Sequence, residues 1–203
     1  PYATCPYCQT LILHDARGVE EIGKVAVLPF DVSPIQLGTV LQPGEQRLTV
    51  VGRVRWAWSG GSWNEWLALA DDGAQHWLGE AAGLYMLTAE TPQWLRLAEL
   101  ERFVQGGSIA PGLAVQRSGG ETFYATDVKT VECLGSEGDL PFSTKIGTRM
   151  TSIDFRAASG AVLSLQRDER GATAWCGESW DLAGLRPSNL RAIAGWTLPE
   201  AMR

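Results

Sequence analysis

The chain has 203 residues, a formal net charge of -6 and only three lysines among its 17 basic residues. Binding to the phosphate backbone of a nucleic acid needs clustered Lys and Arg, so this composition excludes nucleic-acid binding as the main function. No apolar run approaches the roughly 18 to 20 residues that span a bilayer, and no leader precedes a cleavage site. Four cysteines are too few for a disulfide scaffold of this length, so we expect a cytoplasmic protein without membrane insertion.

Residues 1–33 are expected to form a zinc-knuckle remnant and a linker rather than a domain. Cys5 and Cys8 enclose a two-residue turn. Such a turn aims two thiolates at one tetrahedral Zn²⁺ and supplies half of a structural site, so we predict both cysteines as zinc ligands. Because the chain begins with Pro1 rather than Met, we expect the complete site in a longer chain. Zinc binding by these 203 residues stays open.

Other interpretations of the cysteines and histidines also stay open. The CPYC motif is the active-site motif of glutaredoxins, so a thiol oxidoreductase that uses Cys5 is an alternative. Glutaredoxins, however, place a strand before the motif and a long helix after it, and neither pattern is present here. Cys133 and Cys176 lie in apolar β-like runs and are expected to pack as small hydrophobes. His14 is a candidate third ligand, whereas His76 is expected to pack or to face solvent.

Residues 34–105 are predicted to form a first β module with a connecting helix. Short β-rich runs alternate with glycine-containing turns, of which Asp72-Gly73 is the strongest hairpin signal. Thr91-Pro92 begins a helical stretch that Gly106-Gly107 ends, which matches an N-cap, a proline in the first turn and a glycine stop. The strands are expected at residues 48–58, 63–70, 75–78 and 84–88.

Residues 106–203 are predicted to form a second, related module. The order of glycines and apolar runs that follows Leu37 is echoed after Pro111, which indicates a duplicated unit whose two copies pair to bury a sheet face. An acid-rich loop is expected at residues 132–139. The fold is therefore predicted to be mainly β, with two small β-barrel or SH3-like modules in tandem. The strands of this module are expected at residues 113–115, 122–133, 150–155, 162–165 and 173–176.

Five of the nine tryptophans fall within 22 residues of the first module. Trp56 and Trp58 share one face of a strand, which is the geometry of an aromatic platform for a sugar, a peptide or a cation. The interpretation that we favour is that the tryptophans fill the core of a small barrel, since each buries a large apolar area. The other three are Trp63, Trp66 and Trp77.

Glu65 stands between Trp63 and Trp66 in this cluster. If alternation places it opposite the tryptophans it faces solvent, and if it turns inward it needs a partner such as Arg53 or Arg55. A structural ion pair is expected rather than catalysis. The candidate ligand-binding residues are Trp56, Trp58, Glu65, Asp71 and Asp72.

Several motifs, in order along the chain, make it resemble a bacterial family. They are Gly52-Arg53, Trp63-Asn64-Glu65-Trp66, Asp72-Gly73, Trp77-Leu78-Gly79-Glu80 and Glu137-Gly138-Asp139-Leu140-Pro141-Phe142. In these positions the chain is similar to domain of unknown function four-one-seven-eight. That family has a zinc-ribbon head with two CxxC pairs, of which one is present here. The resemblance implies a zinc-binding head and no established activity. Members of the family tend to be encoded beside polyamine-synthase-like and small membrane proteins, which implies a role in envelope or stress physiology.

The sequence shows no recognisable catalytic site, because no Ser-His-Asp or Cys-His order and no phosphate-binding loop is present. We therefore expect a protein that is not an enzyme. The first expectation is a non-catalytic binding or scaffold protein with an unidentified protein partner. The second is recognition of a small ligand, a polyamine or a glycan, by a Trp-rich acidic pocket, and the third is the thiol oxidoreductase named above.

Overall fold

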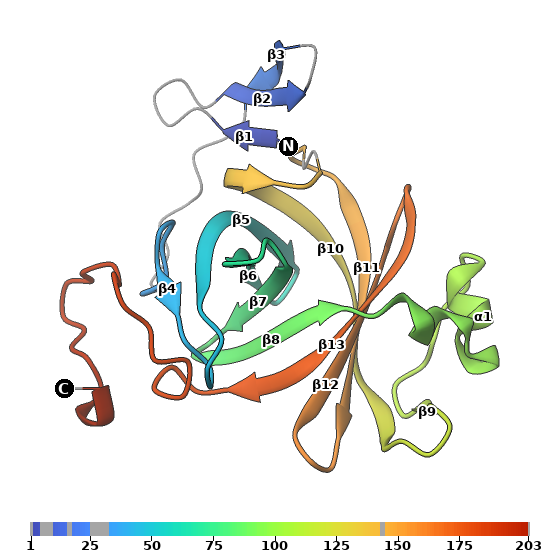
Figure 1. Cartoon of the computed structure of the whole chain (residues 1–203). Coiled ribbons are helices and arrows are strands. Elements are labelled where there is room, and N and C mark those ends of the chain that lie inside the picture. Colours follow the sequence, from blue (N-terminus) through green and yellow to red (C-terminus); the bar gives the residue numbers. More distant parts are fainter. Residues whose placement is uncertain (1, 5–9, 16–17, 25–32, 143–144, 203) are drawn as a thin grey trace.

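The computed structural model describes residues 2–4, 10–15, 18–24, 33–142 and 145–202, and its regular structure is mainly β, as predicted (Figure 1). Two 3-10 helices, η1 (Pro92–Arg96) and η2 (Glu200–Met202), and the α-helix α1 (Ala98–Val104) accompany the strands. The strands are β1 (Tyr2–Thr4), β2 (Thr10–Asp15), β3 (Gly18–Lys24), β4 (Val40–Leu41), β5 (Leu48–Trp58), β6 (Gly61–Ala70), β7 (Gln75–Ala81), β8 (Leu84–Glu90), β9 (Ala114–Gln116), β10 (Thr122–Leu140), β11 (Arg149–Ala157), β12 (Ala161–Asp168) and β13 (Gly171–Trp180).

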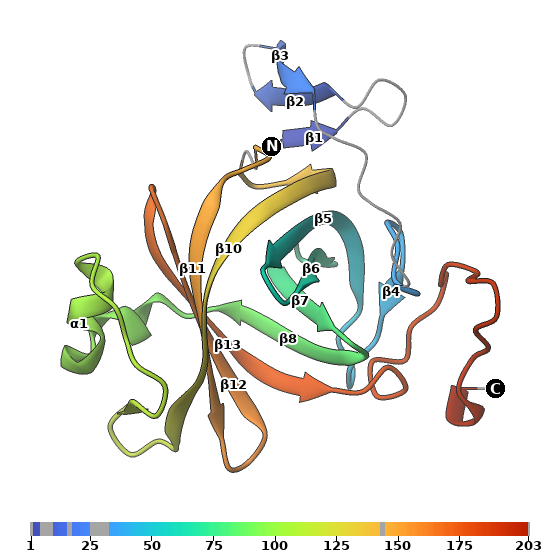
Figure 2. The ribbon, with the colours of Figure 1, turned by 180° about the vertical axis from the view of Figure 1, so that it is seen from behind.

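Eight of these strands form one closed antiparallel barrel. Strands β5 to β8 form one meander and β10 to β13 form another. The two meanders join at two seams, where β8 pairs with β13 and β5 pairs with β10. Figure 1 shows the ring that results, and Figure 2 shows it from behind.

The single barrel differs from the two tandem small barrels that the sequence predicts. Each predicted module supplies only four strands of the ring, and four strands leave two open sheet edges. Pairing the edges of one meander with those of the other satisfies the backbone N–H and C=O groups along both edges. The repeated β pattern therefore builds two halves of one barrel.

Glycines make both seams possible, because the two backbones approach closely there. A Cβ at Gly52 would lie 2.0 Å from the carbonyl oxygen of Asp139 across the β5–β10 seam. A Cβ at Gly177 would lie 1.9 Å from the carbonyl oxygen of Leu87 across the β8–β13 seam. A side chain at either position would push the paired strands apart.

The predicted acid-rich loop at residues 132–139 is instead the second half of β10. It pairs with β5 from Glu132 to Gly138, with a register shift between Cys133 and Gly135. Gly138 has a φ of +74°, which glycine adopts without strain. The glycines and acidic residues conceal this strand in the sequence, because its pairing partner lies some 80 residues away.

The barrel wall separates an inner core from two outer ones. Inside lie Val54, Trp56, Trp77 and neighbouring apolar side chains. One outer core packs α1 and η1 against β10 to β13, so the helix lies outside the ring in both views. The other packs the chain around β4 and the segment after β13 against β5 to β8. Side chains thus alternate between barrel interior and outer layer along each strand.

The helical stretch predicted after Thr91 is present but divided. Leu97 has an extended backbone, with φ of -70° and ψ of 135°, and separates η1 from α1. Trp94 meets Phe123 edge to face at 5.1 Å, and Leu100 and Phe103 are fully buried. The stretch therefore anchors the connection between the two meanders to the outside of the barrel.

The three N-terminal strands, β1 to β3, extend the sheet at one end of the barrel. Strand β1 pairs with β10 at Leu140 and Asp139, and β2 and β3 continue from it (Figure 1). The stretch after the CPYC motif, where the sequence shows no long helix, forms the strand β2. Within the described residues, no helix is long and apolar enough to cross a membrane.

Candidate functional site

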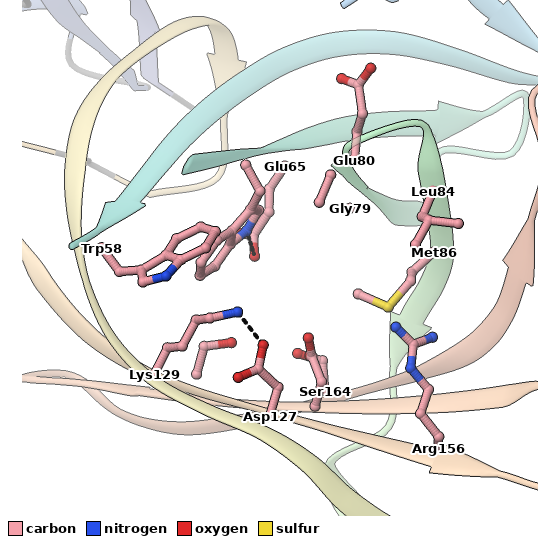
Figure 3. A pocket seen from close by; sticks show the side chains of 14 residues that line it. Trp58, Glu65, Gly79, Glu80, Leu84, Met86, Asp127, Lys129, Arg156 and Ser164 are labelled. Carbon is pink, nitrogen blue, oxygen red and sulfur yellow. Dashed lines mark hydrogen bonds and ion pairs between the residues drawn. The ribbon is translucent and has the colours of Figure 1, made fainter. Parts of the chain in front are cut away.

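The barrel interior contains a cavity of about 170 Å³ near one end. Its lining comes from strands of both meanders, so no single sequence segment forms it. Trp58 and Trp63 form an aromatic wall, with ring centroids 5.6 Å apart, and Met86 lies across from Trp58 (Figure 3). Polar side chains line the remainder. The cavity therefore combines apolar walls with charged groups, as small-molecule sites do.

Glu65 projects into the barrel from β6. Alternation along this strand places Trp63 and Glu65 inside and Asn64 and Trp66 in the outer layer. The Glu65 carboxyl accepts three hydrogen bonds, from Trp56 Nε1 at 2.9 Å, Trp63 Nε1 at 3.2 Å and Gln166 Nε2 at 2.6 Å. These three donors fix the carboxyl group at the edge of the cavity.

The ion pair predicted between Glu65 and Arg53 or Arg55 is not formed. Both arginines alternate to the other side of β5, where Arg53 donates to Asn64 and Arg55 donates to Ser62. The cross-strand neighbour of Glu65 is Val54, which packs in the inner core. Alternation thus separates the arginines from the glutamate by the thickness of the barrel wall.

Burial raises the pKa of Glu65 to about 7, even though the hydrogen bonds from Trp63, Trp56 and Gln166 oppose the shift. The charged group that acts on it is Asp154, which is also acidic and raises the pKa further. Burial likewise raises the pKa of Asp154, against a hydrogen bond with Ser164 and the charge of Arg156. The cavity therefore holds two carboxyl groups whose charged forms burial disfavours.

We expect the free energy of unfolding to fall as pH rises from about 5 to about 8, with Glu65 contributing at most about 3 kcal/mol. A carboxyl group with a raised folded-state pKa stabilises the fold below its unfolded pKa, and this contribution is lost as pH rises through about 7. Solvent screening at the partly exposed carboxyl group reduces the effect. Urea unfolding of wild type and Glu65→Gln at both pH values measures it. Identical pH dependence of the two proteins would contradict the assignment.

A second charged group occupies the mouth of the cavity. Lys129 Nζ lies 4.3 Å from the centroid of the Trp58 ring and forms an ion pair with Asp127. The Lys129 and Asp127 side chains are 27% and 43% exposed, so solvent reaches this pair. Figure 3 shows both side chains, with Arg156 and Ser164, on the side of the cavity opposite Glu65.

A further cavity of about 330 Å³ lies beyond the side chains of Trp56 and Gln166, which donate hydrogen bonds to Glu65. Trp56 and Gln166, two of the three donors to Glu65, line it together with Trp175 and Phe142. Phe142 stacks on Trp77 at 5.7 Å, which covers the inner core at this end. Glu65 therefore lies between two cavities of the barrel interior.

The predicted ligand-binding residues fall into two groups. Glu65 and Trp58 line the first cavity, and Trp56 lines the second. Asp71 and Asp72 lie in the exposed β6–β7 turn, where Asp71 pairs with Arg47 at 3.2 Å and Asp72 accepts a hydrogen bond from the backbone of Ala74. Neither aspartate lines a cavity. The candidate site thus keeps three of the five predicted residues.

Several cavity residues were missed by the sequence analysis. Ser152, Asp154 and Ser164 belong to runs that were predicted as strands, and Asp127 and Lys129 belong to another. Polar residues at every second position of an apolar strand are the signal that could have identified them. That signal does not tell which face of the strand is the interior.

The predicted zinc ligands Cys5 and Cys8 lie outside the described residues, so zinc binding there stays a prediction. Among residues that are described, no group of three or more metal-ligating side chains comes together. Cys133 packs in the inner core, where burial raises the pKa of its thiol to about 11, and Cys176 packs against an outer core. His76 contacts Gln46 at 3.0 Å.

Residues 36–181 match the family model named Domain of unknown function (DUF4178). The chain belongs to the DUF4178 family. A search of curated proteins and a search of solved structures each found no match. The matched range of this DUF4178 chain contains all eight barrel strands, so the family model describes the barrel itself.

The motifs that carry the family resemblance divide between two sides of the barrel wall. Arg53, Asn64, Trp66 and Glu80 form a buried network in the outer layer of the DUF4178 barrel. Asn64 links the two charges, since it accepts from Arg53 and donates to Glu80 at 3.0 Å. Glu65, from the same motif as Trp66, faces the cavity. One four-residue motif thus supplies both the outer network and the candidate site.

Proposed function

We propose that this chain is a non-catalytic binding protein whose barrel takes a small organic cation at Glu65. The observation that supports the proposal is a carboxyl group held inside the barrel by three N–H donors, beside a cavity and without a basic partner among the described residues. Hydrogen bonds position this group but leave its negative charge uncompensated. A ligand with a positive charge supplies the missing partner.

The cavity walls suit an amine with a short alkyl chain. Aromatic faces attract cations, and Trp63 offers one beside Glu65, whereas Lys129 lies over the Trp58 ring. Met86 and Leu84 lie opposite Trp58 and can contact the methylene groups of a ligand (Figure 3). We therefore propose alkylamines, the chemical class that includes polyamines, with affinities of micromolar to millimolar order because few contacts are available.

We expect n-butylamine to bind wild-type protein about tenfold more tightly at about pH 8 than at about pH 6. The reason is that Glu65, with a pKa near 7, is mostly ionised at the higher pH and mostly neutral at the lower, while the amine stays protonated at both. Calorimetric titration at each pH gives the affinity. n-Butanol, which has the same chain without the charge, is expected to show no saturable binding.

Two variants distinguish amine binding at Glu65 from a general effect of the net charge of the protein. Glu65→Gln is expected to lose amine binding and its pH dependence. Asp71→Asn removes the same charge from the exposed turn outside the cavity and is expected to bind like wild type. Equal loss in both variants, or pH-independent binding in wild type, would show that the amine responds to net charge rather than to Glu65.

The same titrations distinguish the other predicted functions. Saturable binding of a neutral oligosaccharide, unaffected by Glu65→Gln, would favour the glycan alternative. Absence of binding of either ligand up to millimolar concentration would favour a protein scaffold. The predicted thiol chemistry depends on Cys5, outside the described residues, and would persist in Glu65→Gln.

A further inference from the structure

The charges that face the cavity are unequal in number. Three carboxyl groups, those of Glu65, Asp127 and Asp154, face two basic groups, those of Lys129 and Arg156. Glu80 also borders the cavity, but its carboxyl group points away from it and accepts hydrogen bonds in the outer layer (Figure 3). When all groups are ionised, one negative charge is left over.

The pairing of these groups assigns the surplus charge to Glu65. Lys129 pairs with Asp127, and the positive charges of Arg156 and Lys129 both act on Asp154. Glu65 lies across the cavity from them and has Asp154 as its charged neighbour. One ammonium group of a ligand therefore neutralises the net charge of the cavity. A second ammonium group would find no uncompensated carboxylate there.

A second ammonium position nevertheless exists, and the chain itself occupies it. Lys129 Nζ lies over the Trp58 ring at 4.3 Å while it pairs with Asp127, which is the arrangement that recognises a ligand ammonium. We propose that Lys129 is a specificity-determining residue that fills this second position and restricts the ligand to a single ammonium group. The inference rests on the proposed amine site at Glu65 and names the ligand class of that site as monoamines.

The test compares n-butylamine with 1,4-diaminobutane, which has the same chain and one more ammonium group. In wild type 1,4-diaminobutane is expected to bind about tenfold more weakly than n-butylamine, because Lys129 repels its second ammonium group. In Lys129→Met, which keeps an unbranched apolar stem against Trp58 but frees Asp127, the ratio of diamine to monoamine affinity is expected to rise about tenfold. Lys129→Arg retains the charge and is expected to keep the wild-type ratio.

A second variant tests whether the gain comes from Asp127. Adding Asp127→Asn to Lys129→Met removes the freed carboxylate and is expected to return the ratio to its wild-type value. Thermal melting of each variant shows that the barrel is intact. An unchanged ratio in a folded Lys129→Met protein that still binds n-butylamine would overturn the role of Lys129 alone, whereas failure of wild type to bind either amine would overturn the amine site itself.

Discussion

Trp66→Ala is expected to lower the free energy of unfolding by about 3 to 5 kcal/mol. The Trp66 side chain is fully buried in the outer layer, its Nε1 donates to Glu80 at 2.8 Å, and the Arg53 guanidinium lies 4.6 Å from its ring centroid. Truncation would leave a large void beneath Arg53 and remove a donor from a buried carboxylate. Urea unfolding followed by circular dichroism measures the change.

Trp63→Ala is the matched control, because it removes the same side chain three residues away. Trp63 is only half-buried and borders the cavity, so its removal enlarges a space that already exists. We expect it to cost about 1 to 2 kcal/mol. If both tryptophans filled the core, as the sequence analysis favours, their effects would be equal, and equal measured effects would contradict the placement of Trp63 at the cavity.

Glu80→Ala is expected to destabilise the barrel by about 3 to 5 kcal/mol. The Glu80 Oε2 atom accepts from Ser33 Oγ at 2.7 Å, Asn64 Nδ2 at 3.0 Å and Trp66 Nε1 at 2.8 Å. Removing the carboxylate takes the shared acceptor away from three buried donors. It also leaves the buried Arg53 with less negative charge nearby. Urea unfolding at neutral pH measures the loss.

Glu99→Ala provides the reference for this prediction. Glu99 is exposed in α1, so the same truncation removes no buried hydrogen bond. Its effect is expected to stay within about 0.5 kcal/mol. A Glu80→Ala effect as small as that of Glu99→Ala would mean that the outer network contributes little to stability.

Glu65 and Glu80 illustrate how two glutamates of one barrel differ. Both accept three hydrogen bonds, and both receive one from a tryptophan indole. Glu80 belongs to a network that also holds Arg53, through Asn64, although it too borders a cavity, on the outer side of the barrel wall. Glu65 lacks a basic partner among the described residues and meets a cavity. The first arrangement stabilises the fold, and the second is suited to a ligand.

The sequence alone determined the local structure. Alternating apolar residues and glycine turns predicted the strands of the two meanders, except the second half of β10, which was predicted as a loop. Both signals arise from contacts between neighbouring residues. Alternation also predicted that Trp56 and Trp58 share a face, and both pack in the inner core. The family resemblance likewise came from motifs that can be read along the chain.

Only the tertiary structure decided how the strands close and which face points inward. The β5–β10 and β8–β13 seams join residues about 75 to 95 positions apart, and nothing local to either strand specifies that pairing. Once the ring closes, Glu65 meets Gln166 from the other half of the chain, and Lys129 reaches Trp58. Alternation gives two faces to each strand, but barrel closure assigns one of them to the interior, because that assignment depends on the curvature of all eight strands together.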